Sequence, residues 1–237
     1  MDMLFLCVVF MLHSLSIKDL VFTWSKQSDF TLRIPKWQVK TGEKVFLHGR
    51  SGEGKSTLLN LIAGIENRYT GDIQVLGQDM AKLSQRQKDA FRANNIGIIF
   101  QQFNLLPYLS AEQNILLAQR FRSEKQAPSS EELASICERL ELSSMLLKQK
   151  ANELSVGQQQ RVAVARALYG SPELIIADEP TSALDTQTRE QFIQLLLDCA
   201  QSSTVIFVSH DLSLASHFDQ QLSLAQLQQQ GSEIHVA

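Results

Sequence analysis

Residues 49–57 (GRSGEGKST) have the composition and spacing of a phosphate-binding loop, lying between an apolar run at 45–48 and a helix-like run at 58–63. Glycine adopts backbone angles closed to other residues, so successive N–H groups can turn toward one anion at a helix N-terminus. Lys55 would neutralise the β- and γ-phosphates, and the Ser56 hydroxyl is placed to hold Mg²⁺. The residues predicted to contact the nucleotide here are Gly49, Arg50, Ser51, Gly52, Glu53, Gly54, Lys55, Ser56 and Thr57.

Three further polar residues follow apolar runs that read as buried strands. Asp178 and Glu179 follow the run at 174–177, and His210 comes shortly after the run at 204–208. Taken singly, each acid could be a surface carboxylate and the histidine a hydrogen-bonded loop residue. Open α/β sheets bind ligands beyond the carboxyl ends of their strands, and phosphoryl transfer needs a metal ligand, a water-orienting group and a charge stabiliser. We predict these roles for Asp178, Glu179 and His210, in that order.

The elements that must position these residues alternate between strands and helices. Strands with alternating polarity are predicted at 15–23 and 30–39, and continuous apolar strands separated by helices predict an α/β fold with a parallel sheet covered on both faces. The stretch 110–150 is helical and should form an inserted lobe. Further strands are expected at 45–48, 72–76, 96–100, 174–177 and 204–208, with weak strands in 220–236. Helices are expected at 84–93, 111–121, 131–140, 162–169 (with Ser155 as an N-cap), 186–201 and 213–218.

Composition narrows the class of partner. Lys and Arg number 22 against 25 Asp and Glu, a net charge of −3, so the chain lacks the basic footprint of non-specific nucleic-acid binding, and we predict no nucleic-acid partner. Cys7, Cys137 and Cys199 are isolated and lack metal-ligand spacing, which predicts neither zinc nor disulfides and is typical of a reduced cytosolic protein.

Residues 1–12 (MDMLFLCVVFML) are apolar but shorter than the roughly 20 residues that span a bilayer. Asp2 stands where a secretory signal would be basic, and no small-residue cleavage site follows. We interpret the segment as an upstream extension of the reading frame, with Met11 as the natural start. The alternative is an apolar tail that lies against a membrane partner.

With these motifs, residues 15–227 resemble the nucleotide-binding subunit of ATP-binding cassette (ABC) transporters. Residues 154–161 (LSVGQQQR) are similar to the family signature, 174–180 to its second phosphate-site strand, and 182–185 (SALD) to the loop that follows. Gln101 resembles the loop glutamine, His210 the switch histidine and Trp24 the adenine-stacking aromatic. Without the resemblance, Trp24 could equally be a core aromatic.

The resemblance implies a P-loop NTPase core with a mainly parallel sheet, an N-terminal antiparallel β subdomain and an inserted helical subdomain at about 108–168, all in one domain spanning 13–237. It implies ATP and Mg²⁺ as cofactors, with Ser56, Gln101 and Asp178 at the metal and Glu179, His210, Lys55 and Gln101 in catalysis. Two subunits would close head to tail with ATP between them, so that Ser155, Gly157 and Gln158 bind the partner's nucleotide; Asp185 is also expected to bind nucleotide.

A membrane permease would then dock near Gln101 and the helical subdomain, holding the chain in the cytoplasm on the inner face of the cell membrane. Two residues depart from the family pattern. Val156 replaces a common glycine at a variable position, so we expect activity to survive. Glu53 adds a carboxylate to the phosphate loop, and we expect its side chain to point outward; the alternative is that it repels phosphate and lowers ATP affinity.

Residues 100–107 (FQQFNLLP) are similar to the branch that serves lipoprotein-releasing and macrolide-exporter systems, although polar amino-acid importers carry a close variant. We therefore predict an ATPase subunit that drives export or extraction. The alternatives are an ABC module of the cell-division type, which signals to periplasmic partners, and an importer ATPase. A soluble ABC protein of translation or DNA repair usually carries a second cassette or a long coiled-coil insertion, and the sequence shows neither.

Overall fold

The computed structural model describes residues 13–24, 30–117, 122, 129–182 and 184–229, so the predicted N-terminal extension lies outside the described residues. The described residues divide into two compact units, one formed by those up to 88 together with those from 206 onward, and the other by those within 89–205. Each unit is described by itself. The prediction of a single domain over 13–237 stays a prediction.

The first unit contains the predicted antiparallel sheet. Its strand order is β2-β1-β4-β5, and Val21 of β1 faces Arg33 of β2 in the register. Buried and exposed side chains largely alternate along β2, as the period-two pattern predicts. Pro35 lies in β2, an edge strand of this sheet, where a missing backbone donor is tolerated. The strands are β1 (His13–Thr23), β2 (Thr31–Lys40), β4 (Tyr69–Val75) and β5 (Gln78–Asp79), and Met80–Lys82 forms the 3₁₀ helix η1.

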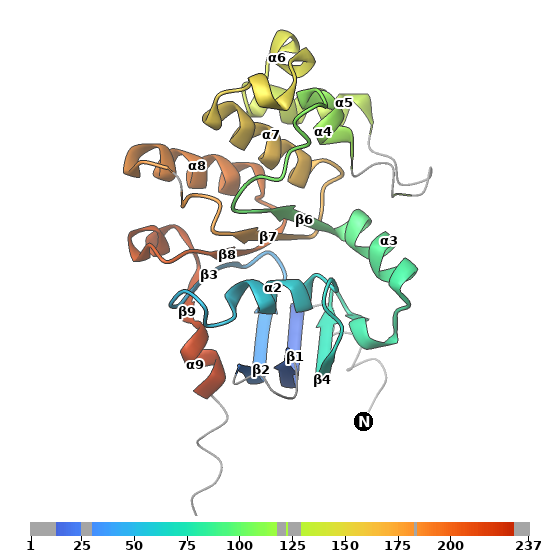
Figure 1. The fold of residues 1–237 in the computed structure, drawn as a ribbon, viewed down its shortest axis with the longest axis vertical. Helices are drawn as coiled ribbons and strands as arrows, with labels where there is room; N and C mark the ends of the chain where they lie inside the picture. The colour runs from blue at the N-terminus through green and yellow to red at the C-terminus, as the bar shows by residue number, and fades with distance from the viewer. Residues whose placement is uncertain (1–12, 25–29, 118–121, 123–128, 183, 230–237) are drawn as a thin grey trace, which may run out of the picture. The chain divides into compact units, whose positions relative to one another are not determined.

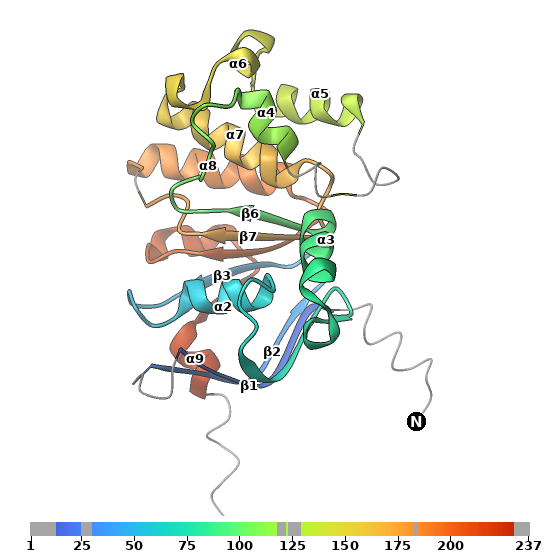
Figure 2. The ribbon, with the colours of Figure 1, turned by 45° about the vertical axis from the view of Figure 1, so that its right-hand side comes forward.

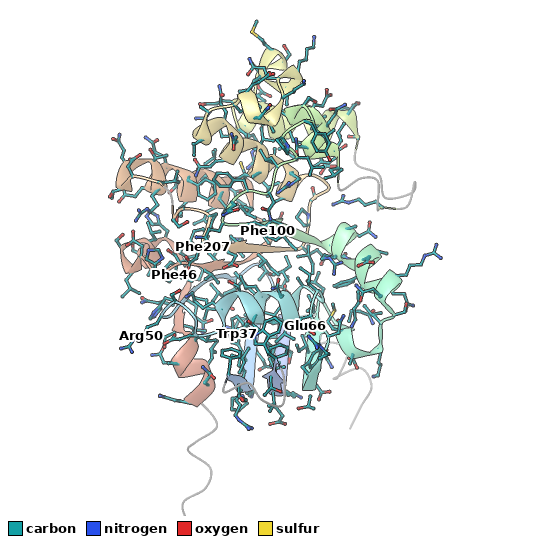
Figure 3. All side chains as sticks on the ribbon, viewed as in Figure 1. Trp37, Phe46, Arg50, Glu66, Phe100 and Phe207 are labelled. Carbon is teal, nitrogen blue, oxygen red and sulfur yellow. The ribbon has the colours of Figure 1, made fainter. Side chains whose placement is uncertain are left out.

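The parallel strands of the first unit lead to the phosphate loop. Strand β3 (Lys44–His48) pairs in parallel with β9 (Gln220–Ser223), and β8 (Thr204–Val208) is its neighbour on the other side. The rings of Phe46 and Phe207, both labelled in Figure 3, stack with centroids 6.3 Å apart in the core. Strands β3 and β8 are almost wholly buried, so their residues are not alternately buried and exposed, whereas β9 is partly exposed.

The C-terminal stretch differs from the prediction of weak strands. After β9 the chain forms helix α9 (Leu224–Gln229), and the predicted helix at 213–218 is the 3₁₀ helix η5 (Leu212–His217). Ser223 and Gln226 cap the start of α9 reciprocally, since each side chain accepts the other's backbone N–H. Figure 1 shows α9 beside β2, where Gln228 Oε1 accepts from Arg33 N at 3.4 Å.

The second unit holds the parallel pair β6 (Ile96–Ile99) and β7 (Leu174–Asp178), with helices α7 (Val156–Leu168) and α8 (Thr186–Cys199), as Figure 2 shows. Gly97 of β6 lies so close to α7 that a Cβ would come within 2.2 Å of the Ala167 carbonyl oxygen. The remaining helices are α4 (Ala111–Ile115), α5 (Ser130–Arg139), α6 (Ser144–Lys148) and the 3₁₀ helix η4 (Ala151–Glu153). Helix α3 (Gln85–Asn95) crosses the boundary between the units.

The helices α4 to α7 fall within the stretch expected to be helical, with two differences in detail. The α-helix predicted over 111–121 ends at Ile115, the next two residues form a tighter 3₁₀ turn, and 118–121 lie outside the described residues. The side chain of Asn114 is bonded to the Leu106 backbone, so a polar anchor interrupts what looked like one apolar face. Helix α6 was not predicted, because its five residues are too few to show a period.

None of the helices in the described part of the chain is long and apolar enough to cross a membrane.

Candidate functional site

The phosphate loop has the geometry of an anion cradle in the first unit. It leads into the eight-residue helix α2 (Lys55–Ile62), whose N-cap residue Gly54 has φ +101° and offers no side-chain cap. A Cβ on Gly54 would come within 2.5 Å of the Phe30 ring, so glycine is required there on two grounds. The start of α2 has no side-chain cap, and the helix dipole favours an anion at that position.

The side chains of the loop divide into exposed and buried sets. Arg50, Ser51, Gly52 and Ser56 are exposed, whereas Lys55 and Thr57 are buried. Lys55 Nζ donates to the carbonyl oxygens of Gly49 at 2.9 Å and Arg50 at 3.0 Å. The ammonium group is therefore held against the entrance of the loop, where a phosphate could take over its donors.

Glu53 does not point outward as expected. Its Oε2 accepts from Arg50 N at 2.8 Å and lies 2.5 Å from the position that a Cβ on Gly49 would occupy. The carboxylate therefore folds back onto the loop, because an orphan backbone donor three residues earlier binds it better than solvent does.

Two aromatic rings lie at the edge of this loop. Thr23 pairs with Thr31 in the β1–β2 register, which puts Trp24 and Phe30 next to each other at the end of that pair, and the Phe30 ring contacts Gly54. Trp24 is 48% exposed and meets Phe22 edge to face. The core interpretation of Trp24 is therefore wrong, and an open ring face near the phosphate loop is what stacking on a purine requires.

His210 belongs to the same unit and the same edge. Ser209, its neighbour, donates from its backbone to the Leu47 carbonyl at 3.2 Å, and Leu47 lies two residues before Gly49. His210 itself is exposed. The structure thus brings His210 and the phosphate loop to the carboxyl ends of β8 and β3, as the sequence predicts.

The acidic half of the predicted site lies in the second unit. Ile99 of β6 faces Ala177 of β7, so Gln101 and Glu179 each lie two residues beyond a paired position, at one edge. Gln101 Nε2 donates to the Ser182 hydroxyl at 3.2 Å, which ties the glutamine to the loop after the acids. Glu179 has φ +46°, a backbone conformation that costs a non-glycine residue energy and that concentrates at functional sites.

The predicted signature segment forms the start of α7. Ser155 Oγ accepts from Gln158 N at 3.3 Å and Gln158 Oε1 accepts from Ser155 N at 2.9 Å, a capping box. Capping uses a lone pair of Ser155 Oγ and leaves its O–H free to donate elsewhere. A Cβ on Gly157 would meet nothing within 4 Å in the described residues, so crowding within the subunit does not explain this glycine.

Asp185 caps the next helix, α8. Its carboxylate accepts from the Thr188 hydroxyl at 2.6 Å and from Thr188 N at 3.0 Å. These bonds, the hydroxyl first, hold the pKa of the Asp185 carboxyl below its usual value. Asp185 is therefore charged at neutral pH, and in this structure its carboxylate caps the N-terminus of α8.

With this geometry in place, comparison with known proteins identifies the family. The family model described as "ABC transporter" matches residues 32–182, well over half of the chain. The chain belongs to the ABC transporter family. It is an ABC ATP-binding subunit, an ATPase, as the motifs predicted.

Relatives within the ABC family agree. The uncharacterized ABC transporter ATP-binding protein YbbA of Escherichia coli (strain K12) is 40% identical over 196 residues, covering 81% of this chain and 86% of YbbA. The macrolide export ATP-binding/permease protein MacB of Bordetella avium is 37% identical, covering 78% of this chain and 28% of MacB. These matches confirm the predicted resemblance to the macrolide-exporter branch.

A solved structure supports the fold. The dimeric post-hydrolysis state of the ATP-binding cassette MJ0796, bound to ADP and Pi, superposes with a TM-score of 0.74 at 34% identity. The match covers 88% of this chain and 93% of that chain. MJ0796 comes from Methanocaldococcus jannaschii, and its sequence is 40% identical to this chain over 192 residues. The predicted α/β P-loop fold class is therefore confirmed.

The donors at the predicted metal position fit Mg²⁺. They are a hydroxyl (Ser56), an amide (Gln101) and a carboxylate (Asp178), and Mg²⁺ prefers oxygen ligands and takes few from the protein when phosphates supply the rest. Within the described ranges, no cluster of three or more His, Cys, Asp or Glu residues could hold a metal by itself.

Sequence reasoning missed Phe30 over Gly54, Arg166, and the contact of Ser182, which it had placed in the 182–185 motif, with Gln101. Arg166 of α7 donates to the carbonyl oxygens of Phe103 and, at 2.8 Å, Asn104, two left-handed residues just after Gln101. Burial lowers the pKa of Arg166 from its usual value, although the group stays cationic. The only signal in the sequence was a polar arginine within an otherwise apolar helical run.

Proposed function

We propose that this chain is the motor subunit of an ABC exporter, in which the phosphate loop binds ATP with Mg²⁺ and Glu179 activates the attacking water. The observation that carries the proposal is the loop itself, with a left-handed glycine at the uncapped start of α2 and Lys55 held beneath it. Backbone N–H groups arranged in this way at a helix N-terminus favour a polyphosphate ligand. The strained backbone of Glu179 supports its role as general base.

The remaining roles follow the geometry of each unit. Trp24 would stack on the adenine, and His210 would contact the γ-phosphate from the edge that it shares with the loop. Asp178 and Gln101, with Ser56, would hold Mg²⁺, which polarises the phosphate oxygens when bound. In this proposal the protein contributes positioning and charge, and no covalent intermediate forms.

We propose that the active form is a head-to-tail homodimer. Three features support it: the free O–H of Ser155, the absence of crowding at Gly157, and Val156, an apolar residue that is 53% exposed. All three features are expected at a surface that contacts the nucleotide bound by a second copy of the chain. The related cassette MJ0796 was solved as a dimer with ADP and Pi.

The work of closing and opening would be passed to a membrane permease. MacB proteins are described as export ATP-binding/permease proteins, which supports export and a permease that docks near Gln101 and the helices of 108–168. The chain would then be peripheral to the inner face of the membrane. No observation favours the signalling or importer alternatives.

The test is Glu179→Gln. The amide keeps the shape of the carboxylate and cannot accept the proton, so turnover should fall about 10²–10⁴-fold while ATP binding persists. The variant should also elute as a dimer with ATP in size-exclusion chromatography. Glu190→Gln, on the exposed side of α8, is the matched control and should hydrolyse ATP like the wild type. Wild-type turnover in Glu179→Gln would remove Glu179 from the mechanism.

A further inference from the structure

A negatively charged side chain of the phosphate loop, that of Glu53, is hydrogen-bonded to the backbone of the loop itself. The Glu53 carboxylate accepts the Arg50 N–H at 2.8 Å, within a loop whose backbone donors are arranged for negative groups. The Lys55 ammonium contacts the same residue, Arg50, through its carbonyl oxygen, at 3.0 Å. Because the N and O of one residue are about 3 Å apart, the two charged groups are no more than about 9 Å apart.

Two positively charged side chains, those of Arg50 and Lys55, lie in the loop, and they differ in how strongly they offset the charge of the Glu53 carboxylate. Arg50 is exposed and its side chain extends away from the loop (Figure 3), so water and salt screen its guanidinium. Glu53 is partly buried and Lys55 is buried. The carboxylate and the lysine therefore dominate the field that an incoming phosphate meets.

We propose that Glu53 makes this loop select nucleotide whose charge is already compensated by a divalent cation, over the free nucleotide. This inference rests on the proposed function, since it concerns the same nucleotide site. A carboxylate repels each phosphate charge, and a bound divalent cation cancels about two of them. The penalty from Glu53 is therefore larger for metal-free nucleotide than for the metal complex.

The size of the effect follows from Coulomb's law. For a phosphate bound at the Lys55 ammonium and therefore about 8 Å from the carboxylate, with an effective dielectric constant between about 20 and 80, Glu53 weakens binding about two- to thirty-fold per unit of phosphate charge. Salt reduces the effect because the Debye length is about 8 Å at physiological ionic strength. With a screened factor of about two per charge, removing the carboxylate should tighten metal-free ADP, which carries about three charges, about eightfold and the metal complex, which carries about one, about twofold.

The experiment measures the affinity of the full chain for a fluorescent ADP analogue, mant-ADP, with Mg²⁺ and with EDTA. ADP avoids hydrolysis during the titration. Glu53→Gln keeps a side-chain oxygen for the Arg50 N–H and loses the charge, whereas Glu53→Ala loses both. Both variants should narrow the ratio of the metal-free to the metal-bound dissociation constant about fourfold, and the narrowing should shrink at high salt.

Glu43 supplies a matched control in the same unit. Its Oε2 accepts from Lys40 N at 2.8 Å, the same three-residue spacing, in the turn between β2 and β3. Glu43→Gln removes an equivalent charge and an equivalent bond acceptor away from the phosphate loop. It should leave both dissociation constants unchanged.

The outcomes separate the inference from the function on which it rests. An unchanged ratio in both Glu53 variants, with folding confirmed by circular dichroism, would overturn the inference. A narrowed ratio in Glu53→Ala alone would assign the effect to the hydrogen bond and also refute the electrostatic argument. A wild-type chain that binds mant-ADP in neither form would refute the proposed function instead.

Discussion

The anchoring of the turn after Gln101 by Arg166 gives a prediction whose size can be worked from the structure. Arg166 donates to two carbonyl oxygens, of Phe103 and Asn104, which have φ of +54° and +48°. Hydrogen bonds from charged groups contribute about 1.5–3 kcal/mol each, and left-handed residues cost about 1–2 kcal/mol each. Without the anchor the turn should relax.

We expect Arg166→Ala to lower the free energy of unfolding of the second unit by about 3–5 kcal/mol. Arg166→Lys should lose about half as much, because a lysine ammonium cannot reproduce the planar fork of two donors. The ATPase rate should also fall, because Gln101 lies at the start of the released segment. The assay is urea unfolding followed by far-ultraviolet circular dichroism, since α7 and α8 lie in this unit.

A control lies on the same helix. Arg161 pairs with Glu141, and their side chains are 39% and 75% exposed. Exposed ion pairs contribute about 0–1 kcal/mol, so Arg161→Ala should cost little. If Arg166→Ala costs no more than Arg161→Ala, the reasoning about the half-buried Arg166 anchor is refuted.

The remaining predictions concern two glycines, a cap and an acid. Gly97→Ala should destabilise the second unit by about 1–3 kcal/mol in urea unfolding, because its Cβ would strike the Ala167 carbonyl; wild-type stability would contradict this. Gly157→Ala should leave the free energy of unfolding unchanged or raise it by up to about 1 kcal/mol, yet reduce ATP-dependent dimerisation measured by size-exclusion chromatography. A variant with a lower free energy of unfolding would disprove this prediction. Ser155→Ala should cost about 1 kcal/mol as a lost cap and reduce hydrolysis much more than nucleotide binding by the monomer; an equal loss of both counts against a site in the partner. The hydrogen bond from Arg68 lowers the pKa of Glu66 from 4.5 to about 2, so the stability that the ionised Glu66 contributes is present above pH 4.5 and is lost as the pH falls from 4.5 toward 2. In Arg68→Ala, the urea concentration at the unfolding midpoint should therefore decrease less steeply as the pH falls through this range. The same decrease in the variant and the wild type would reject the assignment.

Much of the site was predictable because its chemistry is local. The glycines, Lys55 and the hydroxyls of the phosphate loop lie within nine consecutive residues, and the cap formed by Ser155 spans one helical turn. Hydrophobic periodicity likewise predicted β1, β2 and α5 to within a few residues. It failed at 224–229, where the Ser223 and Gln226 cap was overlooked although leucine, alanine and glutamine all favour a helix.

The sequence by itself determined the family, the phosphate loop and the residues at the strand ends. These features depend on residues close together in the sequence, whose spacing and hydrophobic period can be read directly. Only the tertiary structure decided what holds those residues in place. Arg166 reaches Asn104 across 62 residues, and Gln101 reaches Ser182 across 81. The direction of Glu53 was also undetermined, although its partner is only three residues away, because a carboxylate chooses between solvent and a backbone donor according to how the folded loop exposes that donor.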